Sequence, residues 1–255
     1  MNKLCVVGDS YNLTYGRQFN GRPVSKDLLK QVFDFSYEMC FGSGYHRSYR
    51  SGGQTCRRAG EQFCNTFQGK LAEVVLYNYL TSKQINCKEP DFGVYGYGVW
   101  DNEDLSVYGS SISIKSAAHF SNLLLLETKD YDYNGNYIPN LNTQRTTAYD
   151  YYMLIRFNPD IKSIFRTKRL LYSDYIDRST LEKIIFGLNW EYDFAGYVTH
   201  NEFVNAIREH NIIPQNAFLN GRTQMDASNY YIQAGDLNQI DTLCPSLFEK
   251  LETVW

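Results

Sequence analysis

Apolar residues along the chain recur with two spacings, one helical and one strand-like. A first helix is expected after the capping residue Ser25 and as far as about Phe41, where Gly42 fits a C-terminal stop. A second helix is predicted within residues 60–82, because apolar side chains return there every four residues and form one buried stripe. The stripe consists of Phe63, Phe67, Leu71, Val75 and Tyr79.

Strand-like segments follow in the middle of the chain. Residues 149–157 are apolar enough to predict a buried strand. Residues 117–126 fit either a helix or a strand, because they contain an uninterrupted run of four leucines. Shorter β-like runs are expected at residues 92–95, 105–108 and 111–116.

Two later helices are predicted from capping boxes that begin at Ser179 and Thr199, each with a Glu three residues on. We expect the first to end at Gly187 and the second near Asn211. Helices interspersed with strands indicate an α/β fold with a mixed central sheet, flanked by helices and followed by helical C-terminal additions.

The 255 residues, 43% of them apolar, suit one domain. Within it we expect a core at about 60–170 and a C-terminal subregion at about 171–255. A net charge of −3 excludes a globally basic nucleic-acid binder, so any DNA contact needs a local basic patch.

The six cysteines form no CxxC and no zinc-binding spacing, which favours reduced core thiols in a reducing, cytoplasmic compartment. The N-terminal apolar run is too short for a signal peptide, and no run approaches the roughly 20 residues of a membrane span.

Residues 104–115 carry the most informative chemistry. They alternate on both sides of Gly109-Ser110, which suits a two-residue type II′ hairpin turn. Counting outward places Asp104 opposite Lys115, on one polar face with Ser113. A cross-strand salt bridge with no catalytic role explains the same pair.

Glu73 lies on the second predicted helix, about 200° around its axis from Leu71 and therefore off the apolar stripe. Either this carboxylate belongs to a solvated helix face, or it is directed at the hairpin.

A helical Glu, an Asp at a strand start and a hairpin ending in x-x-Lys resemble the PD-(D/E)xK nuclease superfamily. The matching residues are Glu73, Asp104 and Ser113-Ile114-Lys115. Residues 47–236 also resemble type II restriction endonucleases in several segments. These are NTFQGKLAE (65–73), PDF (90–92), DL (104–105), IKS (114–116), YDFAGYVTH (192–200) and NGRTQMDASNYYIQAGD (220–236).

The resemblance implies Mg²⁺-dependent hydrolysis of double-stranded DNA at a specific sequence. Asp104 would be the main metal ligand, with Glu73 and the backbone carbonyl of Ile114 as further ligands. Lys115 would position or deprotonate the attacking water and stabilise the transition state. The resemblance further implies a homodimer and a cognate DNA methyltransferase encoded nearby.

This chain departs from the family pattern at one position. Ser113 stands where the family usually has Asp or Glu, which removes one negative charge and gives Glu73 more weight as a ligand. The motif aspartate also has a second candidate, Asp91, because Pro90-Asp91 spells the motif literally.

DNA contacts are expected from exposed Arg, Lys and Gln side chains. A basic cluster enters the Glu73 helix, and two loops carry residues suited to base edges; a solvated surface explains these residues equally well. The candidates are Arg47, Arg50, Arg57, Arg58 and Lys70 in the cluster, and Gln144, Arg145, Arg222 and Gln224 in the loops.

Three other functions fit the same residues. A structure-selective or repair nuclease of the superfamily would cut without sequence preference. A DNA-binding protein that has lost its chemistry through Ser113 would bind the duplex and never nick it. A globular domain with a purely structural Asp104–Lys115 pair would have no DNA activity.

Overall fold

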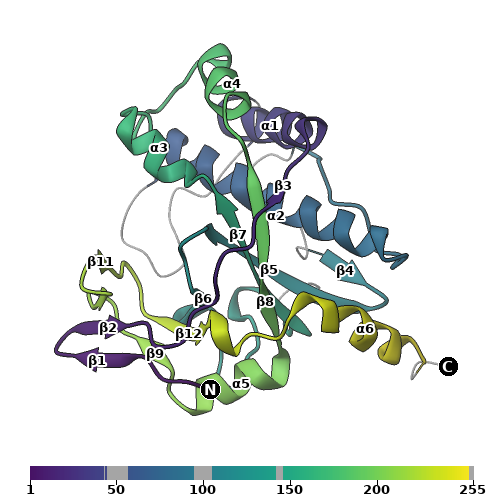
Figure 1. Cartoon of the computed structure of the whole chain (residues 1–255), viewed down its shortest axis with the longest axis vertical. Coiled ribbons are helices and arrows are strands. Elements are labelled where there is room, and N and C mark those ends of the chain that lie inside the picture. The colour runs from purple at the N-terminus through teal and green to yellow at the C-terminus, as the bar shows by residue number, and fades with distance from the viewer. Residues whose placement is uncertain (43, 45–56, 95–104, 142–145, 253–255) are drawn as a thin grey trace.

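The computed structural model describes residues 1–42, 44, 57–94, 105–141 and 146–252, with side chains as far as Leu247. A five-stranded mixed sheet lies at its centre, in the order β3-β8-β7-β5-β4 (Figure 1). β5 and β7 are parallel and the other neighbours are antiparallel, so the prediction of an α/β fold with a mixed central sheet is confirmed. The strands are β3 (Arg22–Pro23), β4 (Leu105–Val107), β5 (Ser110–Ala118), β7 (Tyr151–Asn158) and β8 (Glu191–Thr199).

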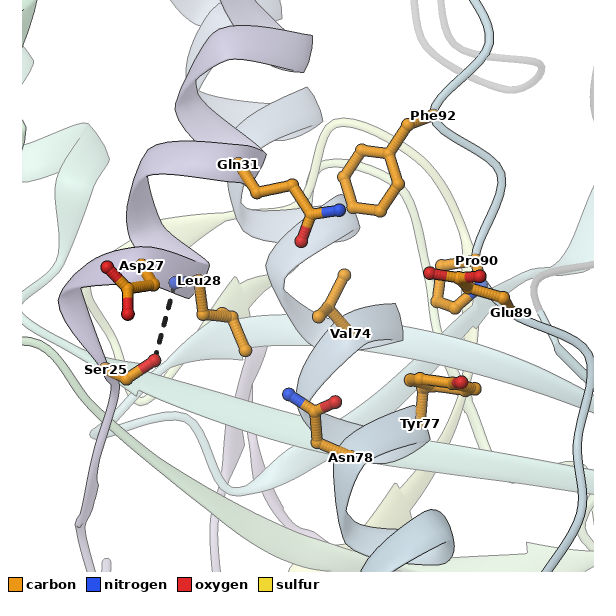
Figure 2. Close-up of a pocket in the computed structure, with 10 residues that line it drawn as sticks. All are labelled: Ser25, Asp27, Leu28, Gln31, Val74, Tyr77, Asn78, Glu89, Pro90 and Phe92. Atoms are coloured by element: carbon orange, nitrogen blue, oxygen red, sulfur yellow. Dashed lines mark hydrogen bonds between the residues drawn. The ribbon is translucent and has the colours of Figure 1, made fainter.

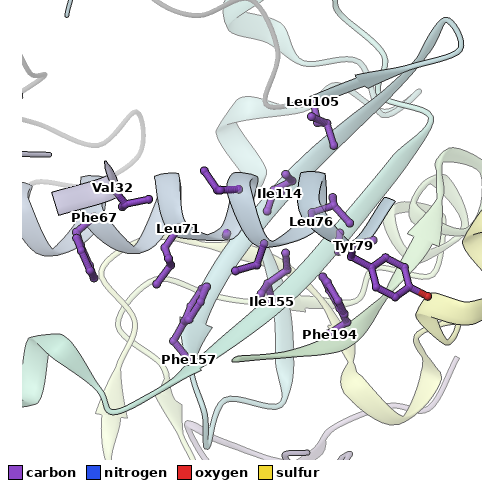
Figure 3. Close-up of a cluster of buried hydrophobic side chains, with 14 of the residues drawn as sticks. Val32, Phe67, Leu71, Leu76, Tyr79, Leu105, Ile114, Ile155, Phe157 and Phe194 are labelled. Atoms are coloured by element: carbon purple, nitrogen blue, oxygen red, sulfur yellow. The ribbon is translucent and has the colours of Figure 1, made fainter. Parts of the chain in front are cut away.

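One long helix, α2, packs against one face of this sheet (Figure 3). Its predicted stripe is buried throughout, from Phe63 to Tyr79, because the four-residue spacing keeps these side chains on one side. Leu71 and Leu76 of α2 belong to one apolar cluster with Ile114 and Ile155 of the sheet. The helices are α1 (Lys26–Phe41), α2 (Ala59–Ser82), α3 (Ile161–Thr167), α4 (Arg178–Phe186), α5 (His200–Arg208) and α6 (Leu243–Glu252).

The opposite face is covered by α5 and by a second sheet, with Tyr152 and Leu154 of β7 in their shared core. This second sheet consists of β6 (Leu123–Glu127), β12 (Asn229–Gln233) and β9 (Ile212–Ile213). A third sheet contains β1 (Cys5–Val7), β2 (Ser10–Asn12), β10 (Phe218–Leu219) and β11 (Thr223–Gln224). Short 3₁₀ turns occur at η1 (Thr128–Asp130), η2 (Ile138–Asn140), η3 (Ala234–Asp236) and η4 (Ile240–Thr242).

Most predicted helix starts are correct. Ser25 caps α1 by accepting a hydrogen bond from the Leu28 amide, and Thr199 forms a complete capping box with Glu202. The box predicted at Ser179 is wrong, because Asp177 caps α4 and its carboxylate accepts from the Thr180 amide. A carboxylate two residues earlier thus supplies the acceptor that the serine was expected to supply.

Three helices end in the same C-terminal motif without glycine. In α3, the Leu170 amide donates to the Phe165 carbonyl and the Arg169 amide to the Arg166 carbonyl, the Schellman pattern. Arg169 therefore has φ +58°, in the left-handed region. Gln84 after α2 and His210 after α5 occupy the equivalent positions, with φ +63° and +53°.

The β4–β5 hairpin exists, but its predicted turn is wrong. The turn residues are Tyr108 and Gly109, both at positive φ as in a type I′ turn, and the ladder pairs Leu105 with Ile112. The Tyr108 hydroxyl accepts a hydrogen bond from the Asn86 amide at 3.1 Å, which connects the turn to the segment after α2. The register therefore differs by two residues from the predicted one, which leaves each side chain on its predicted face.

Residues 117–126 form no helix, and the leucine run is strand β6, paired with β12. None of the helices in the described parts of the chain has both the length and the apolar character needed to cross a membrane.

The described cysteines are free thiols, but they are not all in the core. Cys5 is exposed, which corrects the expectation for this residue, whereas Cys64 is buried. Burial raises the pKa of the Cys40 thiol to about 12 and also raises that of Cys64, so both stay protonated.

A buried ion pair joins the two central strands. Arg156 of β7 is fully buried and donates to both carboxylate oxygens of Asp193 on β8, at 2.9 and 2.5 Å. Its remaining donors reach the carbonyls of Arg17 and Gln18 at 2.8 and 3.0 Å. The pair thereby fixes the N-terminal segment to the sheet.

Replacing Arg156 with Met should lower the free energy of unfolding by about 3–5 kcal/mol, because Asp193 would remain buried without a partner. Urea denaturation followed by circular dichroism measures this loss. The control is Arg58→Ala, which breaks the exposed pair with Asp174 and should change stability by less than about 1 kcal/mol. Equal losses in the two variants would contradict the assigned role.

Two glycines should respond oppositely to alanine. Gly109 has φ +76° and open space around its missing Cβ, so Gly109→Ala should destabilise the fold by about 1 kcal/mol through backbone strain alone. Gly69 lies in α2 with equally open space, so Gly69→Ala should stabilise by up to about 1 kcal/mol. Thermal unfolding gives both signs, and a stabilised Gly109→Ala would disprove the turn geometry.

Candidate active site

Ser113 and Lys115 lie on one face of β5. Ile112 and Ile114 point into the cluster with α2, and successive strand residues alternate, so Ser113 and Lys115 point to the opposite face. Ser113 is 1% exposed beside Tyr152, its neighbour on β7. Lys115 is half-buried beside Leu154.

The Lys115 ammonium has no hydrogen-bond or ion-pair partner among the residues that the structure describes. A lysine can bury its methylene stem while the ammonium reaches solvent, which leaves this charge available to an incoming anion. The predicted partner, Asp104, lies outside the described residues, which resume at Leu105.

Glu73 is held by a neighbour on its own helix. Its carboxylate accepts a hydrogen bond from the Lys70 ammonium, and their side chains are 16% and 8% exposed. The ammonium also lies 5.1 Å from the ring centre of Phe35 and 5.8 Å from that of Phe92. The exposed phosphate contact predicted for Lys70 would therefore require this buried pair to open.

The structure does not bring Glu73 and Lys115 together through any described bond. Glu73 belongs to α2, on the sheet face that holds Ile114, whereas Lys115 points to the other face. Glu73 and Lys115 could therefore meet only around the edge of the sheet, past Leu105, where the described part of β4 begins.

Asp91, the alternative motif aspartate, occupies a turn. One of its carboxylate oxygens accepts a hydrogen bond from the Gly93 amide at 2.7 Å, an Asx-turn. A local turn therefore explains its side chain, and Asp91 does not lie on the hairpin that carries Lys115.

Asp150 is a carboxylate that the sequence did not single out. It precedes β7 and accepts hydrogen bonds from the Ser111 amide and hydroxyl, at 2.9 and 3.4 Å. Ser111 alternates with Ile112, so Asp150 lies on the same sheet face as Ser113 and Lys115. Only the parallel pairing of β5 with β7 could have revealed this neighbour.

The predicted DNA contacts are scattered over the described surface. Arg58 is exposed and paired with Asp174 at 3.0 Å, and Arg57 is half-buried. Arg222 and Gln224 are exposed on the β10–β11 hairpin. Four further candidates lie outside the described residues: Arg47, Arg50, Gln144 and Arg145.

A groove of about 290 Å³ lies between α1, α2 and the segment before the hairpin. Figure 2 shows Glu89, Pro90 and Phe92 on one side, with Val74 and Tyr77 from α2. Its volume is at the lower end for small-molecule sites. It contains none of the predicted catalytic side chains.

In the part of the chain that the structure describes, no three His, Cys, Asp or Glu residues gather as a metal-binding group. No family model matches the chain, and no curated protein or solved structure matches it either.

The contribution of the Lys70–Glu73 pair to stability can be tested separately from any activity. Glu73→Gln should destabilise the protein by about 1–3 kcal/mol, because it leaves a buried ammonium without its anion. Adding Lys70→Met should recover most of this loss, as an apolar side chain of similar length replaces the unpaired cation. Chemical denaturation gives both values.

The matched control is Glu182→Gln, which breaks an exposed helical pair with Arg178 and should cost at most about 0.5 kcal/mol. A double variant as unstable as Glu73→Gln alone would show that the unpaired Lys70 ammonium does not cause the loss of stability.

Proposed function

We propose that this protein is a Mg²⁺-dependent endodeoxyribonuclease that cuts double-stranded DNA at a specific sequence, as type II restriction endonucleases of the PD-(D/E)xK superfamily do. The observation that carries the proposal is Lys115, a half-buried lysine whose ammonium has no hydrogen-bond or ion-pair partner among the described residues, in an Ile-Lys step on β5. The likeness of Glu73, Asp104 and Ser113-Ile114-Lys115 to the superfamily motif is the second support.

Lys115 would act directly on the scissile phosphate. Its ammonium would stabilise the negative charge that develops when water attacks phosphorus, or Nζ in its neutral form would accept the proton of that water. Strand β5 is bonded to β7 from Ile112 to Ala118, so the backbone below Lys115 is held in place before substrate binds.

The described donors alone do not complete a Mg²⁺ site. Glu73 is paired with Lys70, and Ser113 offers a neutral hydroxyl on the opposite sheet face from α2. The proposed metal therefore depends on Asp104, outside the described residues, with Glu73 released from Lys70. When bound, Mg²⁺ would neutralise phosphate charge and activate water.

One observation favours a second function, a DNA-binding protein without cleavage. Ser113 replaces the usual motif carboxylate and is 1% exposed, so its hydroxyl has little access to a metal or a phosphate. Such a protein would bind duplex DNA with or without Mg²⁺ and leave it intact.

Purified protein with Mg²⁺ should convert unmethylated phage-length DNA into discrete fragments, and EDTA should abolish this. Lys115→Met should lower the cleavage rate at least about 100-fold, the usual effect of removing one transition-state contact, without unfolding the chain. Gel electrophoresis with single-turnover kinetics measures both.

The matched control is Lys183→Met, since Lys183 is an exposed lysine on α4, a helix that packs against α1. A metal-dependent smear would indicate a structure-selective or nonspecific nuclease. Intact DNA in every lane, from a protein that binds the duplex, would support the non-cleaving alternative, and full activity of Lys115→Met would contradict the proposed site.

A further inference from the structure

Three cations project from the C-terminal end of α3. Arg166, Lys168 and Arg169, here called the α3 basic segment, are all exposed. Their side chains make no hydrogen bond or ion pair with any residue that the structure describes. In a chain of net charge −3, three unneutralised cations within four residues form a marked local excess of positive charge.

The segment is displayed on a rigid frame. The amides of Arg169 and Leu170 close the Schellman motif, and Phe165 is fully buried, stacked on Phe63 of α2 at 5.8 Å. The Gly60 amide at the start of α2 donates to the Ser173 carbonyl at 2.9 Å, so the segment that follows α3 lies beside the start of α2 (Figure 1). The three cationic side chains therefore start from a fixed backbone.

The acidic residues nearby are already engaged. Asp160 caps α3 through the Lys162 amide, and Asp174 pairs with Arg58 at 3.0 Å. Tyr172, three residues after Arg169 in the chain, is 67% exposed and offers a further hydroxyl donor. The surface thus offers guanidinium, ammonium and hydroxyl donors to an incoming anion.

We propose that the α3 basic segment binds the phosphate backbone of duplex DNA. Arginine suits phosphate because its planar donors bond two oxygens at once, and tyrosine hydroxyls also bond phosphates. The adjoining exposed aromatic residue is a tyrosine, whereas a membrane-binding face would expose Leu, Phe or Trp. The inference rests on the proposed function, because it states where the duplex substrate is held.

Fluorescence anisotropy with a labelled duplex in EDTA tests binding without cleavage. The variant Arg166→Ala/Lys168→Ala/Arg169→Ala should bind about tenfold or more weakly and equally so for different sequences. The slope of log Kd against log salt should fall by about 3, since each lost phosphate contact removes roughly 0.9.

A charge-matched control carries Lys26→Ala, Lys183→Ala and Arg208→Ala, three exposed cations on other helices. It loses the same net charge, so long-range attraction falls equally. Its Kd should stay within about twofold of the wild-type value and its salt slope should be unchanged, because these side chains contact no phosphate.

A second pair of variants separates binding from folding. Arg169→Gly and His210→Gly both place glycine at a left-handed helix end, so each should raise Tm by about 2–4 °C. Only Arg169→Gly should weaken DNA binding, by roughly threefold at moderate salt. A stabilised protein that binds less tightly cannot be explained by loss of structure.

Wild-type binding that the triple variant retains in full would overturn the inference and leave the nuclease proposal standing. Binding that the triple variant loses, by a chain that never cuts, would support the inference and refute the nuclease. A wild-type chain that neither binds nor cuts would refute both. Adhesion to phosphatidylserine-containing vesicles, lost in the triple variant while DNA affinity is unchanged, would assign the segment to a membrane and overturn the DNA contact.

Discussion

The fold depends on the buried pair of Arg156 and Asp193. A fully buried guanidinium would be strongly unfavourable without partners, and here its nitrogens donate to carboxylate and carbonyl oxygens. Two of those oxygens are backbone carbonyls of residues 17 and 18, so the arginine orders a segment far away in sequence. The Asn20 amide completes the arrangement by donating to Asp193 at 3.0 Å.

This clamp determines how the sheet is completed. Once residues 17–20 are fixed over β7 and β8, the chain continues directly into β3 at the edge of the sheet and then into α1. β7 in turn pairs in parallel with β5 along seven residues, from Ile112 to Ala118. The position of Lys115 therefore depends on a pair of charges that never contacts it.

Sequence patterns predicted the elements whose signals are local. The α2 stripe and the Thr199 capping box were correct, because spacing and neighbouring side chains decide both. The turn at Tyr108 was not predictable, because bulky residues rarely adopt positive φ and the contact of its hydroxyl with the Asn86 amide is tertiary. Lys115 still lies on its predicted face despite the register error, since a shift of two residues leaves the alternation of side chains unchanged.

The candidate site shows the same division between features with a local signal and features that depend on tertiary contacts. Alternation along β5 correctly grouped Ser113 with Lys115, but it gave no information on what lies across the strand, such as Asp150. Nor does helical angle reveal that Glu73 is bonded to Lys70 under two aromatic rings, which requires α1 and Phe92 to be in place. The basic residues within 166–169 are visible in the sequence, but a net charge of −3 for the whole chain gives no sign of a local excess of positive charge. What distinguishes them is tertiary: the surrounding carboxylates are bonded elsewhere, and the cations are left facing solvent on a fixed helix end.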